Sequence, residues 1–274
     1  MADRAREFAR LKRALYRRLD AGPREVTVVY AQGKTGTSSI AKGLKRAGFD
    51  PVFQIHTLNP RTLENVEAQY IERRSDNHPR HVWEAQWLNA HRPSVERPWT
   101  LVTSVRDPIA RIVSRYFQQE SRFGGLRQGR SADELASELH DQFLAQNNRL
   151  GGIGWDWFEA ELAPVLGQSV YDTPFDPAVG HATIETPHVR ALIVRNESLD
   201  RAPDALRTHF GRPVEISSEN VGTDKDYGTL YRDVLARFRP PAGYVDRVYR
   251  TRQATHFYAP EELERFRARW TRPL

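Results

Sequence analysis

The spacing of apolar side chains predicts one amphipathic helix and one buried strand at the start of the chain. Over residues 3–19, apolar positions recur on one helical stripe among many arginines, which is typical of a helix that packs on a domain. The β-branched run REVTVVYAQ (24–32) predicts a buried strand. A loop over 32–38 then leads into a helix that ends near Ala47, where Gly48 suits the C-terminal cap.

The alternation of strand and helix continues toward the middle of the chain. DPVFQIHTL (50–58) predicts a second strand, and HVWEA (81–85) is compatible with a short third one. PWTLVTSVR (98–106) predicts another buried strand, and a helix follows from Asp107. This order of elements predicts an α/β fold with a central, mostly parallel sheet flanked by helices.

The second half of the chain adds strands and a final helix. VRALIVR (189–195) and PVEIS (213–217) predict two more strands. The segment 169–185 predicts an irregular strand or hairpin outside the main sheet. The last helix is expected to start near Pro260, which suits a first helical turn, and its buried stripe contains Leu263, Phe266 and Trp270.

The composition restricts the classes of function. The chain has no cysteine, which excludes disulfides, thiolate catalysis and cysteine-ligated metals. No apolar run of about 18 residues predicts a membrane span, and the first residues are too charged for a secretory signal peptide, so we expect a cytoplasmic protein. The net charge of +6, from 41 Lys and Arg against 35 Asp and Glu, favours an anionic ligand. Because no long basic run and no zinc-finger or RNA-binding signature is present, we expect no nucleic-acid partner.

The segment QGKTGTSS (32–39) joins the first predicted strand to its helix. Free N–H groups and the positive end of the helix dipole make such a helix start an anion site. The segment fits neither the Walker pattern GxxxxGK[ST] nor the dinucleotide pattern GxGxxG. The candidate phosphate-binding residues are Gly33, Lys34, Thr35, Gly36, Thr37, Ser38 and Ser39.

A second strand-to-helix turn carries Arg106. Asp107 is a good N-cap for the helix that follows, but capping does not account for an arginine at the carboxyl end of a buried strand, where α/β sheets bind their ligands. Ser114 stands about two helical turns further on. Arg111 and Arg115 are weaker candidates for an anion, with a solvated surface position as the alternative.

Together the two turns resemble the motifs with which sulfotransferases bind 3′-phosphoadenosine 5′-phosphosulfate (PAPS). QGKTGTSSI is similar to their 5′-phosphosulfate loop, and VRDP…R..S.YF is similar to their 3′-phosphate motif. The resemblance implies a P-loop-like sulfotransferase fold in which Arg106 and Ser114 hold the 3′-phosphate. Further segments, including LIVRNESL and NVGTDKDYG, are similar to bacterial capsular-polysaccharide-synthesis sulfotransferases, and there is a more distant similarity to heparan sulfate 2-O-sulfotransferases.

This resemblance implies transfer of a sulfuryl group to a hydroxyl of a carbohydrate or a small natural product, with release of adenosine 3′,5′-bisphosphate (PAP). Lys34 would stabilise charge on the leaving oxygen, and no metal is required. His56 is the first candidate for the general base, because it ends the second predicted strand beside the loop and its pKa suits proton transfer near neutrality. Glu84 is the alternative base.

Four further residues are candidates for ligand contacts. The resemblance implies that Lys225 and Tyr227 close over the nucleotide. Trp155 and Trp157 are candidates for an acceptor wall that stacks on a ring, and packing in the core is the alternative for this pair.

We expect one domain over residues 1–274. Its parts are the N-terminal helix (3–19), a donor-binding core (25–120 and 189–230) and an acceptor-side insertion (121–188). A P-loop kinase of a nucleoside or sugar is the alternative function, and a nucleotide- or nucleic-acid-binding module without chemistry is a third hypothesis. Acceptor identity, oligomeric state and contact of the basic N-terminal helix with a membrane surface stay open.

Overall fold

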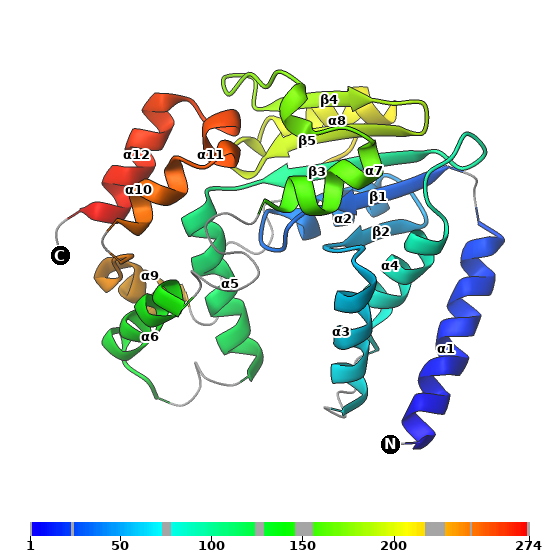
Figure 1. Cartoon of the computed structure of the whole chain (residues 1–274), viewed down its shortest axis with the longest axis horizontal. Coiled ribbons are helices and arrows are strands. Elements are labelled where there is room, and N and C mark those ends of the chain that lie inside the picture. Colours follow the sequence, from blue (N-terminus) through cyan, green and yellow to red (C-terminus); the bar gives the residue numbers. More distant parts are fainter. Residues whose placement is uncertain are drawn as a thin grey trace.

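A computed structural model describes residues 2–22, 25–72, 78–123, 129–145, 156–216, 228–241 and 243–272. Within these ranges the strands form one five-stranded sheet with the order β2-β1-β3-β5-β4 (Figure 1). Four strands are parallel, and β4 pairs antiparallel with β5. The strands are β1 (Val26–Tyr30), β2 (Val52–Ile55), β3 (Trp99–Val105), β4 (His181–Glu185) and β5 (Val189–Arg195). This arrangement confirms the predicted α/β fold with a mostly parallel sheet.

Helices cover both faces of the sheet because its central strands are apolar on both sides. Every residue of β1 and β3 is buried, and successive side chains of a strand point to opposite faces. Val29 and Val102 belong to the core that packs on α2 (Thr37–Arg46) and α8 (Ala202–Phe210). Val28 and Leu101 belong to the larger core on the other face. That core includes residues of α1 (Ala2–Asp20), α3 (Pro60–Glu72), α4 (Arg80–Ala90) and α5 (Pro108–Phe123).

The later helices lie to one side of α5. In Figure 1, α10, α11 and α12 lie together beside the start of α5, and α6 lies next to α9. A short π-helix, η3, precedes α7 and contributes Phe158 and Leu162 to the larger core. These elements are α6 (Ala132–Ala145), η3 (Phe158–Leu162), α7 (Ala163–Leu166), η4 (Val170–Asp172), η5 (Asn196–Ser198), α9 (Gly228–Arg237), α10 (Tyr244–Tyr249), α11 (Arg252–Phe257) and α12 (Pro260–Thr271).

Several predicted elements are confirmed with narrower or slightly shifted bounds. The amphipathic helix over 3–19 is α1, with Phe8 and Leu19 buried. The strands predicted over 24–32, 50–58, 98–106 and 189–195 are β1, β2, β3 and β5. The last helix is α12, where Leu263 and Trp270 are buried.

Three predictions about local structure are wrong. Residues 81–85 lie in α4, where most of the side chains from Val82 to Leu88 are buried, and a short apolar run of this kind does not distinguish a buried helix from a strand. Residues 213–216 form no strand and instead pack against α2, where a Cβ on Gly43 would lie 2.6 Å from the carbonyl oxygen of Glu215. Residues 181–185 of the segment 169–185 lie inside the sheet as β4, because they pair with β5.

None of the helices in the described ranges has both the length and the apolar character that crossing a bilayer requires.

Candidate functional site

The strand order creates a topological switch point between β1 and β3. The chain passes from β1 through α2 to β2 on one side, whereas β3 pairs with the other side of β1. Open α/β sheets bind ligands outside the carboxyl ends of their strands at such a point. The segment 31–36 after β1 and the turn at Arg106 after β3 both lie there.

The segment after β1 turns sharply into α2. Lys34 has a positive φ of 74° and Gly36 has a φ of 90°. A left-handed residue other than glycine stores about 1 kcal/mol or more of strain, a feature that clusters at functional sites. The Thr35 hydroxyl donates to the carbonyl oxygen of Gln32 (2.8 Å) and therefore accepts from Ser104 on β3 (2.8 Å). The bond to Ser104 thus ties the segment to β3, and the N-terminus of α2, which favours an anion, follows directly.

Arg106 connects the two turns directly. Its Nη1 atom donates a hydrogen bond of 3.0 Å to the carbonyl oxygen of Lys34. The guanidinium therefore lies against the segment that the sequence analysis assigned to phosphate binding, although the two residues are 72 positions apart. Ser114 lies on α5, six residues after its first residue and about 9 Å along the helix axis. Within the described ranges, the Ser114 hydroxyl has no hydrogen-bond partner.

His56 follows β2 and lies beside the same segment. Its Nδ1 atom is 2.7 Å from the carbonyl oxygen of Ala31. Because a carbonyl can only accept, Nδ1 carries the hydrogen and the neutral ring keeps its acceptor lone pair on Nε2. A Cβ on Gly33 would lie 4.0 Å from Nε2, so this edge of the ring is adjacent to the loop.

Two side chains that the sequence analysis missed shape this region. The amide of Gln54 donates to the hydroxyls of Thr37 (3.1 Å) and Ser38 (3.2 Å), which ties β2 to the first turn of α2. Glu161 accepts hydrogen bonds from the Tyr30 hydroxyl (2.6 Å), the Thr57 hydroxyl (2.7 Å) and the Leu58 amide (2.9 Å). Alternation along β2 gave a weak signal for Gln54, but nothing local marked Glu161, which lies in η3, 104 and 103 residues from Thr57 and Leu58.

Trp157 packs in the core beneath His56. Its side chain is only 2% exposed, and its ring meets Tyr30 edge to face at 5.0 Å. The indole Nε1 donates to the carbonyl oxygen of His56 (2.9 Å). This position favours the packing alternative over an acceptor wall. Trp155, Lys225 and Tyr227 lie outside the described residues.

Glu84 lies away from the two turns. It is buried on α4 and accepts a 2.8 Å hydrogen bond from Arg80. Burial raises the pKa of this carboxyl, and the charges of Arg80, Lys45 and Arg18 oppose the rise. Lys45 is at the end of α2, and Arg18 pairs with Asp50 just before β2, so Glu84 lies toward the amino edge of the sheet. The structure therefore does not bring this alternative base to the phosphate-binding segment.

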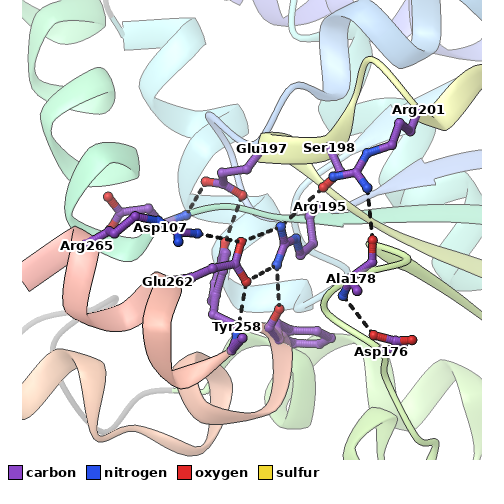
Figure 2. A network of polar contacts seen from close by, with 12 residues as sticks. Asp107, Asp176, Ala178, Arg195, Glu197, Ser198, Arg201, Tyr258, Glu262 and Arg265 are labelled. Atoms are coloured by element: carbon purple, nitrogen blue, oxygen red, sulfur yellow. Dashed lines mark hydrogen bonds and ion pairs between the residues drawn. The ribbon is translucent and has the colours of Figure 1, made fainter.

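A buried polar network fixes the turn that carries Arg106, and Figure 2 shows the part of it around Asp107, Glu197 and Glu262. The Asp107 carboxylate accepts from the Ile109 amide (3.0 Å), the Tyr249 hydroxyl (2.7 Å) and the indole of Trp270 (3.1 Å). Burial and the charge of Asp107 raise the pKa of Tyr249 above its ordinary value, so its hydroxyl stays protonated and donates. The Asp107 amide donates to Glu197 (2.8 Å). The C-terminal helices thus hold the start of α5 in place.

The second half of this network joins the end of β5 to α12. Arg195, the last residue of β5, is bound by both oxygens of Glu262, at 2.6 and 2.8 Å. Glu197 lies in η5, directly after β5, and accepts from the Tyr258 hydroxyl at 3.0 Å. The network therefore links the carboxyl ends of β3 and β5 to α11 and α12.

Comparisons with protein-family models, with curated proteins and with solved structures gave no match. Within the described ranges, no group of three or more His, Cys, Asp or Glu side chains is placed to hold a metal ion.

Proposed function

We propose that the protein is a sulfotransferase with a P-loop-like sulfotransferase fold, which transfers the sulfuryl group of PAPS to a hydroxyl of a carbohydrate or small natural product. The observation that carries this proposal is the hydrogen bond from Arg106 to the backbone of Lys34. It supports a single ligand with two phosphate groups, because the two turns resemble the motifs for the two ends of PAPS and adjoin at one switch point.

In this mechanism the acceptor oxygen attacks sulfur in line with the bridging oxygen of the 5′-phosphosulfate. The new S–O bond forms as the bond from sulfur to the bridging oxygen breaks, and PAP leaves with that electron pair. Lys34 and the N-terminus of α2 stabilise the negative charge that develops on the leaving phosphate. The acceptor proton moves to Nε2 of His56, since Nδ1 is occupied by its bond to Ala31.

The test combines nucleotide binding with turnover. Calorimetry should detect PAP binding to the wild-type protein, and Lys34→Ala and Arg106→Ala should each weaken it by about 10-fold or more, because each removes a charge-assisted phosphate contact. Lys42→Ala changes an exposed lysine of α2 and should bind PAP normally. MgATP binding in preference to PAP would favour a P-loop kinase instead.

Turnover of labelled PAPS against a library of sugars and natural products tests the base. His56→Ala should bind PAP normally and lose about 100-fold or more in kcat. His91→Ala is the matched control, because His91 also directs Nδ1 to a backbone carbonyl, that of Trp87, but at the end of α4. Equal turnover by His56→Ala and wild type would exclude His56 as the base.

A further inference from the structure

Arg111 is a buried arginine, and none of the described residues supplies it with an anionic partner. Only 9% of the surface of Arg111 is exposed to solvent. Within the described part of the chain, its guanidinium forms no hydrogen bond and no ion pair. This position rules out the solvated surface alternative for Arg111.

The charges around Arg111 are positive. Burial, together with the nearby charges of Arg115 and Arg106, lowers the pKa of the guanidinium to about 10, whereas Tyr244 opposes the shift. Arg111 therefore remains protonated at neutral pH. The adjacent carboxylate of Asp107 is bound by Tyr249 and Trp270 instead. A buried cation without a partner is unfavourable, so this group suits an anion that the protein binds.

The geometry of α5 places Arg111 next to the proposed phosphate ligands. Ser114 follows Arg111 by three residues, and residues at this spacing share one face of a helix. Arg106 is close enough for its charge to act on Arg111. Because the charges of Arg106 and Arg111 act on one another, a ligand with more than one negative charge suits the pair, and a phosphomonoester dianion is such a ligand.

We propose that Arg111 is a direct ligand of a phosphomonoester dianion that it shares with Arg106 and Ser114. This inference rests on the proposed function, in which the dianion is the 3′-phosphate of PAP. Arg111 thereby distinguishes nucleotides that carry a 3′-phosphate from those that lack one.

The experiment compares PAP with adenosine 5′-phosphate, which lacks the 3′-phosphate. Calorimetry is carried out on wild type, Arg111→Met, Arg111→Lys and the control Arg115→Met, which removes an exposed charge from the same helix. Arg111→Met should bind PAP about 10- to 100-fold more weakly and adenosine 5′-phosphate with unchanged affinity. Arg111→Lys should be intermediate, because it keeps the charge but not the planar fork. Arg115→Met should stay within about threefold of wild type.

Thermal melting of the same proteins without ligand distinguishes a binding role from a structural one. Arg111→Met should melt at or above the wild-type temperature, because methionine removes a buried charge that has no partner among the described residues. A clearly lower melting temperature would overturn the proposal, as would wild-type affinity for PAP or an equal loss of both nucleotides.

Inorganic phosphate at pH 8 separates this inference from the proposed function. If wild type binds neither nucleotide but phosphate raises its melting temperature and fails to do so for Arg111→Met, the anion site is supported and the sulfotransferase proposal falls. If phosphate and both nucleotides leave wild type unchanged, both proposals fall. If PAP binds wild type and Arg111→Met equally, only the role of Arg111 falls.

Discussion

The ion pair between Arg195 and Glu262 allows a quantitative prediction of stability (Figure 2). The Arg195 side chain is 3% exposed and that of Glu262 is 18% exposed. Arg195 donates to both carboxylate oxygens and also to Phe257 and Ser198. Glu262 also accepts from the Ala259 amide at the start of α12. Glu262→Gln removes the negative charge and one acceptor, while the size of the side chain stays the same.

The expected loss follows from the burial of Arg195. Removing one partner of a buried pair destabilises a protein by about 3–5 kcal/mol, because the other charge is left buried without compensation. Glutamine retains one oxygen for Arg195, and Glu262 is partly solvated, so we expect the lower end, ~3 kcal/mol. For a chain of this size, that change corresponds to a fall in Tm of roughly 6–12 °C.

The pH dependence gives an independent check. Burial by itself raises the pKa of Glu262, but the hydrogen bonds from Arg195 and Ala259 and the charge of Arg195 lower it below the usual value. A lowered folded-state pKa means that the stabilisation is complete above the unfolded pKa, about 4.3, and disappears as pH falls through the folded pKa. Glu262→Gln should therefore lose this part of the acid dependence.

Urea unfolding at pH 7 and at pH 3 measures both effects. Glu264→Gln is the control, because Glu264 pairs with Arg267 on the exposed surface of α12 and should change stability by less than about 1 kcal/mol. If Glu262→Gln destabilised the protein no more than Glu264→Gln at pH 7, the reasoning from burial would be refuted.

Substitutions at Gly36 and Glu161, each with a control, test how the structure around the candidate site is held. Gly36→Ala should destabilise the protein by about 2–3 kcal/mol, because the new Cβ combines a positive φ with contacts of 2.7 Å to Asn196 and Leu199. Gly167→Ala should cost only about 1 kcal/mol in the same urea assay, since its φ is also positive but no atom lies within 4 Å, and equal losses would exclude a steric role at Gly36. Glu161→Ala should lose about 2–4 kcal/mol because the Thr57 hydroxyl and the Leu58 amide lose their acceptor, whereas the Tyr30 hydroxyl keeps the carbonyl oxygen of residue 161, and Glu161→Gln should lose about 1 kcal/mol. Wild-type stability of Glu161→Ala would show that these hydrogen bonds contribute nothing.

The strands and helices that the sequence predicted correctly are those marked by patterns of apolar and β-branched residues over a few positions. Apolar and β-branched residues dominate β1 and β3, and this pattern predicted buried strands. The structure buries every residue of both strands. The strand prediction for segment 81–85 was wrong because five residues cannot distinguish a buried helix from a strand, and only the longer spacing through Leu88 decides. Residues 213–216 pack against α2, and this contact could not be predicted because no pattern within the segment indicates it.

The candidate site divides in the same way. Lys34, Arg106 and His56 were candidates because they follow predicted strands, where an α/β sheet exposes its ligand-binding edge, and the structure brings them to one region. Glu84 was a candidate only through the family resemblance, and α4 places it toward the opposite edge of the sheet. Glu161 could not be found, because its three donors come from segments more than 100 residues away.

The sequence by itself determined the alternation of strands and helices and the two strand-to-helix turns, because backbone propensity and apolar periodicity act over one or two turns of chain. Only the tertiary structure decided that Arg106 bonds to Lys34, 72 positions away, and that Asp107 is held by Tyr249 and Trp270, 142 and 163 positions away. Such contacts depend on strand order and on how helices pack on the sheet. For the same reason, the burial of Arg111 with no anionic partner among the described residues became visible only once the neighbours of α5 were in place.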